Sequence, residues 1–179
     1  MLVVVCGLPG SGKSEVARLI ASKIKATHLQ TDVLRKELNF TVKAKRQTYQ
    51  ALFNRAEEEL RAGNNVVLDG TFYKESFRTK AKELAKKMKT EVYFVEVVSE
   101  EQKIKSRVQD RFKQYKLGKS ESPADYKVYL IMKKQWQPIK EKHFVIDNSN
   151  DLEDLRSQVE NLYSRLTRGG QNNAGKSSG

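Results

Sequence analysis

Short apolar runs recur along the chain and are separated by stretches of mixed polarity. Four of them are rich in β-branched and aromatic residues, which is typical of strands that are buried on both sides of a sheet. A fifth run, THLQTD, is weaker. The pattern therefore predicts five strands, at residues 1–7, 27–32, 65–70, 91–98 and 143–147.

Between these runs, apolar residues three or four positions apart predict helices. The helix in YQALFNRAEEELRAG is expected to stop at Gly63, a favourable residue at a helix C-terminus. A further helix is predicted in SPADYKVYLIMKKQW, where Ser122 suits the N-cap, Pro123 the first helical position, and Asp125 completes a capping arrangement. The periodic helices occupy residues 16–24, 49–60, 77–88 and 152–166.

Strands that alternate with helices predict a parallel sheet with right-handed crossovers and helices on both faces. The fold class is therefore α/β, a doubly wound five-stranded parallel sheet. The length of 179 residues fits one domain. We place this domain at residues 1–166 and expect residues 167–179, which lack large apolar side chains after the helix, to form a flexible tail.

Composition narrows the class of protein. No apolar run approaches the roughly 18 residues of a membrane span, and no basic leader precedes the first run, so we expect a cytoplasmic protein that does not contact a membrane. The single cysteine, Cys6, is expected to be a buried, inert thiol. The net charge of +12 is concentrated in residues 73–89 and 103–119. This excess favours anionic partners, although lysine enrichment for solubility or heat tolerance would produce the same charge.

The junction of the first strand and first helix contains the motif G-x-x-x-x-G-K-[ST]. Glycines let the backbone wrap around phosphate oxygens, and the helix N-terminus adds positive potential. Lys13 is expected to reach the β- and γ-phosphates of ATP, and the Ser14 hydroxyl to bind Mg²⁺. The residues expected to bind nucleotide here are Gly7, Pro9, Gly10, Ser11, Gly12, Lys13, Ser14 and Glu15.

Two aspartates follow predicted strands. Asp69 ends an apolar strand in the manner of a Walker B residue, which holds hydrated Mg²⁺, although it could instead cap the turn before Thr71. Asp32 is a candidate general base beside the γ-phosphate, and Arg35, one helical turn later, could hold an anionic acceptor. Asp32 could also be the N-cap of a short helix, and the two roles are compatible.

Arg107 and Arg111 are four residues apart in a basic segment and share one helix face. We expect them to close on the triphosphate and to stabilise the charge that develops during transfer. The alternative is a solvated basic helix face. Arg78 is a weaker candidate for a further anion contact, whereas His28 and Trp136 are expected to pack.

The motifs GLPGSGKS, TDVLRK, YQALFNRAEEELRAGNNVVLDGTF, RVQDR and SPADYKVY, in this order, resemble a family of P-loop kinases similar to the 5′-kinase domain of phage polynucleotide kinase, gluconate kinase and zeta toxins. The resemblance implies a fold of the adenylate kinase type with a helical lid containing Arg107 and Arg111. It also implies that Asn148 and Ser149 border the adenine. The chain departs from this family at residues 70–72, where relatives have a polar residue after the Walker B aspartate.

The motifs together predict an ATP- and Mg²⁺-dependent kinase that phosphorylates a hydroxyl acceptor. Two acceptors stay open: a single-stranded 5′-hydroxyl polynucleotide, which the positive charge favours, and a small sugar, nucleoside or antibiotic. A switch protein that only hydrolyses ATP is the alternative to an enzyme. The chain has Asp32 and the lid arginines, and it lacks an N-K-x-D guanine-reading motif, which favours the enzyme.

Overall fold

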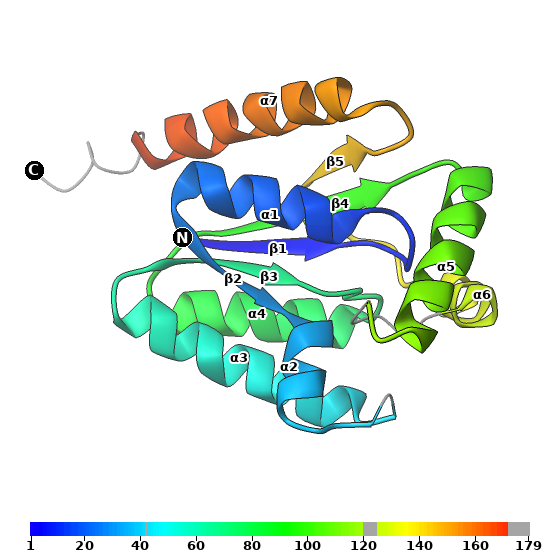
Figure 1. Cartoon of the computed structure of the whole chain (residues 1–179). Helices are drawn as coiled ribbons and strands as arrows, with labels where there is room; N and C mark the ends of the chain where they lie inside the picture. The colour runs from blue at the N-terminus through cyan, green and yellow to red at the C-terminus, as the bar shows by residue number, and fades with distance from the viewer. Residues whose placement is uncertain (42, 120–124, 172–179) are drawn as a thin grey trace, which may run out of the picture.

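Five parallel strands form one sheet in the order β2-β3-β1-β4-β5 (Figure 1). The computed structural model describes residues 1–41, 43–119 and 125–171, with side chains described to residue 167. The strands are β1 (Leu2–Cys6), β2 (Ala26–Gln30), β3 (Asn65–Asp69), β4 (Val92–Val98) and β5 (His143–Asp147). The predicted doubly wound α/β fold is confirmed.

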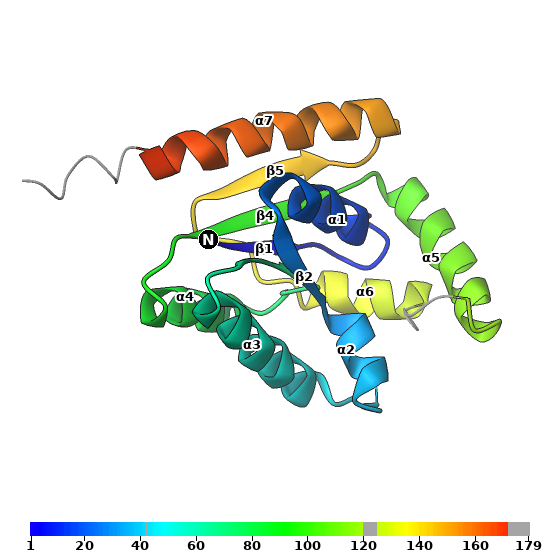
Figure 2. The same cartoon turned by 60° about the vertical axis from the view of Figure 1, so that its left-hand side comes forward.

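Helices cover both faces of the sheet and one of its ends. In Figure 1, α1 and α7 lie above the sheet and α3 and α4 below it, while α5 and α6 lie beyond the carboxyl ends of the strands, as Figure 2 also shows. The helices are α1 (Lys13–Ile24), α2 (Thr31–Glu37), α3 (Lys45–Arg61), α4 (Glu75–Lys87), α5 (Glu101–Lys116), α6 (Tyr126–Lys134) and α7 (Leu152–Gln171). No helix in the described ranges is long and apolar enough to cross a membrane.

The central strand β1 is buried along its whole length. Its odd residues, such as Val3, pack in the core shared with α1 and α7, and its even residues, such as Val4, pack in the core shared with α3 and α4. A strand between two helical layers has no solvent-facing side, so its sequence shows no polar alternation. Cys6 belongs to the second core, which confirms the prediction that it is buried, and burial raises the pKa of its thiol.

Several element boundaries differ from the sequence predictions. The second strand ends at Gln30, because its partner β3 also ends there, and the next residues begin α2. α6 begins at Tyr126 with Asp125 as its N-cap, whose side chain accepts a hydrogen bond from the backbone N of Val128 at 2.9 Å. The predicted cap at Ser122 and Pro123 lies outside the described residues. α7 continues through Gln171, beyond the predicted domain end at 166, and residues 172–179 of the predicted tail also lie outside the described part.

Arg78 is a core residue of α4 and not an anion contact of the site, so the sequence-based expectation for it is wrong. Its side chain is fully buried. The guanidinium donates to the carbonyl oxygens of Phe72 at 2.8 Å and Pro138 at 2.9 Å, and its Nε lies 3.7 Å from Oε2 of Glu141. Arg78 therefore joins the turn after β3 to the segment before β5.

We expect Arg78→Met to lower the free energy of unfolding by about 3–5 kcal/mol, because it leaves the carbonyls of Phe72 and Pro138 without their donor and removes the buried positive charge beside Glu141. Urea denaturation followed by circular dichroism measures this loss. The matched control is Lys82→Met on the same helix, which also removes a partner of Glu141 but from a side chain that is 43% exposed. The control should cost less than about 1 kcal/mol. Equal losses in the two variants would contradict a structural role for Arg78.

Candidate active site

The loop between β1 and α1 has the close packing that its glycines predict. Gly10 and Gly12 have φ values of +87° and +86°, in the left-handed region that glycine tolerates. A Cβ atom on Gly10 would lie 2.6 Å from Cγ2 of Val108 in α5. A Cβ atom on Gly12 would lie 1.8 Å from Nδ2 of Asn148. The loop is therefore enclosed between α5 and the segment after β5, and side chains would not fit at these positions.

Lys13 and Ser14 occupy the first turn of α1, where the helix dipole favours an anion. Pro9 and these two residues line the cavity that is described below. The side chain of Glu15 pairs instead with Arg18 at 2.5 Å, so only the backbone of Glu15 remains for the predicted nucleotide contact.

Four charged groups from four elements converge beside the loop. Burial lowers the pKa of Lys13, and the nearby Arg111 lowers it further, whereas Asp69 and Asp32 oppose the shift. Burial also lowers the pKa of Arg111, again against the attraction of Asp32 and Asp69. The Nε and Nη2 atoms of Arg111 are buried and have no hydrogen-bond partner in the described part of the chain. Such unpaired buried donors fit an anionic ligand.

The residues expected to bind Mg²⁺ also lie together. The Ser14 hydroxyl accepts a hydrogen bond from Nε2 of Gln30 at 3.0 Å. Asp69 is buried at the end of β3, with Oδ2 at 3.3 Å from Nε2 of His28 and with Oδ1 unpaired among the described residues. A hydroxyl and a carboxylate oxygen are hard ligands that suit Mg²⁺. The described ranges contain no cluster of three or more His, Cys, Asp or Glu, but Mg²⁺ held largely by phosphates and water needs none.

Asp32 lies in the first turn of α2 and faces the same space. Nη2 of Arg35 donates to Oδ1 of Asp32 at 2.5 Å, and both side chains are largely buried. The N-cap of α2 is Gln30, so the alternative that Asp32 is itself the N-cap is wrong. The Arg35 contact fixes the orientation of the Asp32 carboxylate.

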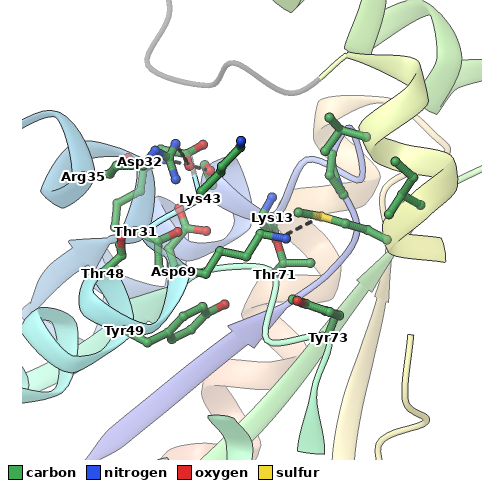
Figure 3. Close-up of a pocket in the computed structure, with 17 residues that line it drawn as sticks. Lys13, Thr31, Asp32, Arg35, Lys43, Thr48, Tyr49, Asp69, Thr71 and Tyr73 are labelled. Carbon is green, nitrogen blue, oxygen red and sulfur yellow. Dashed lines mark hydrogen bonds and ion pairs between the residues drawn. The ribbon is translucent and has the colours of Figure 1, made fainter. Parts of the chain in front are cut away.

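A cavity of about 520 Å³ is lined by Lys13, Ser14, Asp32, Arg35 and Asp69 (Figure 3). Its floor includes Thr71 and the buried rings of Tyr49 and Tyr73, and α6 closes the opposite side. The hydroxyl of Thr71 lies 3.9 Å from Sδ of Met132 in α6. The remaining lining residues are Gln30, Thr31, Lys43, Lys45, Thr48, Val128 and Ile131.

Arg107, the other arginine that the sequence assigned to the lid, contacts the segments after β4 and β5 and does not line the cavity. It donates to the carbonyl of Asn148 at 3.0 Å and to the Ser99 hydroxyl at 3.2 Å. Nδ2 of Asn148 donates in turn to the carbonyl of Ser11 at 3.0 Å, so Asn148 lies against the P-loop. The Ser149 hydroxyl is occupied by the backbone N of Glu100, at 2.8 Å, and by a carboxylate oxygen of Asp147.

We expect Arg111→Ala to lower kcat by roughly 10²-fold with little change in the KM for ATP, because its buried donors, unpaired among the described residues, lie near Lys13, Asp32 and Asp69. Arg107→Ala should mainly raise the KM for ATP, because it loosens the segment that contains Asn148. Steady-state kinetics with varied ATP distinguish the two effects. Indistinguishable kinetics for the two variants would contradict this division, and wild-type kinetics in both would support a solvated basic face.

The sequence predicted most of this arrangement and missed part of it. Lys13, Ser14, Asp32, Asp69 and Arg111 come together as their order along an α/β sheet implies. The missed residues are His28, Gln30, Lys43, Lys45, Tyr73 and the apolar face of α6. Their signal was partly present, because residues two apart on a strand share a face, which brings His28 and Gln30 to the same side of β2.

Comparisons with known proteins show the family and the fold of the chain. A family model described as an AAA domain matches residues 2–139. No curated protein matches the sequence significantly.

Solved structures show the same fold at low sequence identity. The gluconokinase of Sinorhizobium meliloti 1021 is 18% identical with a TM-score of 0.66, over 93% of this chain and 93% of that chain. The APS kinase CysC of Mycobacterium tuberculosis, in complex with AMPPNP and APS, is 19% identical with a TM-score of 0.68, over 93% and 96% of the two chains. Kti12 of Chaetomium thermophilum, in complex with ADP-AlF3, is 18% identical with a TM-score of 0.70, over 92% and 98%.

The neighbours confirm the predicted fold of small P-loop kinases. The matched region begins in β1 and includes the P-loop, both aspartates of the cavity and the lid helices. Because this match covers most of the chain, the protein belongs to the AAA domain family of P-loop proteins.

Proposed function

We propose that the protein is an ATP-dependent kinase that transfers the γ-phosphoryl group to a hydroxyl group of a small molecule. The observation that supports it most directly is that Asp32 and the P-loop residues Lys13 and Ser14 line the same cavity. A switch that only hydrolyses ATP has no need of a second compartment beside the γ-phosphate. The names of the gluconokinase and APS kinase structures agree with a kinase of this kind.

We assign the steps of direct transfer to these residues as follows. Asp32 accepts the proton of the acceptor hydroxyl as the hydroxyl oxygen forms a bond to the γ-phosphorus. The bond from that phosphorus to the β–γ bridging oxygen breaks, and ADP leaves with the electron pair. Lys13 and Arg111 offset the charge on the transferring group. When bound, Mg²⁺ neutralises charge on the β- and γ-phosphates, and Ser14 and Asp69 would hold it.

The cavity favours a small acceptor over a polynucleotide. Its volume of about 520 Å³ is typical of sites that enclose a single small ligand, and α6 covers it with apolar side chains. The charge that favoured a polynucleotide lies largely elsewhere, because the α5 lysines Lys103, Lys105, Lys113 and Lys116 are exposed and do not line the cavity.

ADP release measured with and without candidate acceptors tests the proposal. We expect slow ADP formation with ATP and Mg²⁺ alone, and a rise of at least tenfold when a small hydroxylated acceptor is added. The same assay with 5′-hydroxyl RNA and DNA oligonucleotides, at low and physiological salt, tests the alternative. Activity with the oligonucleotides that falls steeply with salt would replace the small-molecule proposal. A rate that no hydroxyl compound changes would favour the switch.

A further inference from the structure

The cavity contains more positive charge than the transfer of a phosphoryl group requires. Four cationic side chains line it, namely Lys13, Arg35, Lys43 and Lys45, against the two carboxylates Asp32 and Asp69. Arg35 is paired with Asp32, and Lys13 is assigned to the phosphates of ATP. Lys43, which precedes α3, and Lys45, the first residue of α3, remain.

The two lysines have no ion pair with a carboxylate in the described part of the chain. The ammonium group of Lys45 lies over the ring of Tyr73, whose centroid is 5.0 Å from its Nζ. Of the two carboxylates that line the cavity, Asp32 is paired with Arg35, and Oδ2 of Asp69 lies 3.3 Å from Nε2 of His28. Ammonium groups that line a pocket without a carboxylate partner are suited to an anionic ligand.

The opposite side of the cavity has a different character. Val128, Ile131 and Met132 of α6 line it, and Ile131 is 55% exposed although it is a large apolar residue. The ring of Tyr73 adds apolar surface to the floor. A ligand in this cavity therefore contacts both ammonium groups and apolar side chains. Asp32 and Lys13 line the same cavity.

We propose that the phosphoryl acceptor is a small hydroxylated organic anion, a phosphate monoester or a carboxylate, whose anionic group is bound by Lys43 and Lys45. The inference rests on the proposed function. It specifies the acceptor class: neutral sugars and nucleosides leave both ammonium groups without a partner and bind less tightly. Arg35, which the sequence suggested for the anion, acts on Asp32 instead.

Equilibrium binding tests the inference without requiring turnover. The protein is first saturated with Mg²⁺ and AMPPNP, so that added anions do not occupy the P-loop. It is then titrated with two matched pairs, cytidine with cytidine 3′-monophosphate and glucose with gluconate, by isothermal titration calorimetry. We expect the anionic member of at least one pair to bind at least tenfold more tightly than its neutral partner. The pair that shows the difference identifies a phosphate monoester or a carboxylate as the preferred group.

Variants assign the effect to the two lysines. In Lys43→Gln/Lys45→Gln the preference for the anionic member should disappear, while AMPPNP affinity stays within a few-fold of wild type. The matched control is Lys86→Gln/Lys89→Gln, which removes the same charge from exposed positions near the end of α4, outside the cavity. This control should keep the preference. Equal affinities within both pairs in the wild-type protein, or a preference that the Lys43 and Lys45 variant retains, would overturn the inference.

The kinase proposal fails in a distinguishable way. If the anion preference depends on the two lysines but no hydroxyl compound stimulates ADP release, the anion site stands and the phosphotransferase proposal falls. If neutral acceptors are phosphorylated as well as anionic ones, with the same KM in the double variant, the kinase stands and the anionic acceptor class is wrong. Labelling of 5′-hydroxyl oligonucleotides without that of cytidine 3′-monophosphate or gluconate would also reject the small anion.

Discussion

Replacing Lys13 by alanine should reduce phosphoryl transfer below detection while the domain stays folded. The ammonium group lies at the N-terminus of α1, near Asp69, Asp32 and Arg111. Burial lowers its pKa, so the buried positive charge is unfavourable until the phosphates of ATP neutralise it. Removing it takes away the residue that contacts the β- and γ-phosphates and contributes little to the core.

Transfer of ³²P from γ-labelled ATP measures the loss, and circular dichroism verifies the fold. Lys23→Ala is the matched control, because Lys23 lies on the same helix but is exposed and pairs with Glu160. It should keep near-normal turnover. If Lys13→Ala also turned over at the wild-type rate, the assignment of residues 7–14 as a functional P-loop would be wrong.

Asp32→Asn should lower the transfer rate by roughly 10²-fold or more and leave ATP affinity within a few-fold of wild type. Asparagine keeps an oxygen that can accept the hydrogen bond from Arg35, so the local geometry is preserved while the ability to accept a proton is lost. Single-turnover transfer and nucleotide titration measure the two quantities separately.

The control for Asp32 is Glu37→Gln in the same helix, which removes a carboxylate that is exposed and paired with Arg55. Its rate should match that of the wild-type protein. An unchanged rate in Asp32→Asn would mean that Asp32 only orients Arg35.

Local patterns predicted the fold well because each strand and helix is defined by neighbouring residues. Runs such as residues 65–70 admit few structures other than a buried strand, and the alternation of elements then limits the topology. The P-loop was equally local, since its glycines, Lys13 and Ser14 are contiguous. The sequence also predicted that Asp32 and Asp69 belong to the site, because parallel strands end at a common edge, where ligands bind.

The rest of the site depended on tertiary contacts that the sequence does not display. A lysine beside a cavity has the same local sequence signature as one in solvent, so Lys43 and Lys45 were not distinguished from the other basic residues. Arg78 gave the opposite error, because a guanidinium that binds backbone carbonyls in the core resembles one that binds an anion. Arg107 and Arg111 share a helix face, yet only the packing of α5 shows that they contact different partners.

Asn148, which follows β5, donates a hydrogen bond to the P-loop, so the C-terminal part of the chain is needed to complete the folded domain. The region shared with the AAA domain family ends at residue 139, before β5 and α7. A fragment of residues 2–139 would leave the hydrogen-bonding edge of β4 unpaired and the apolar surface under α7 exposed to water. Bare strand edges of this kind pair with one another in neighbouring molecules. The segment that the family model matches is therefore shorter than the folding unit, and the fragment should aggregate whereas the chain extended through α7 stays dispersed.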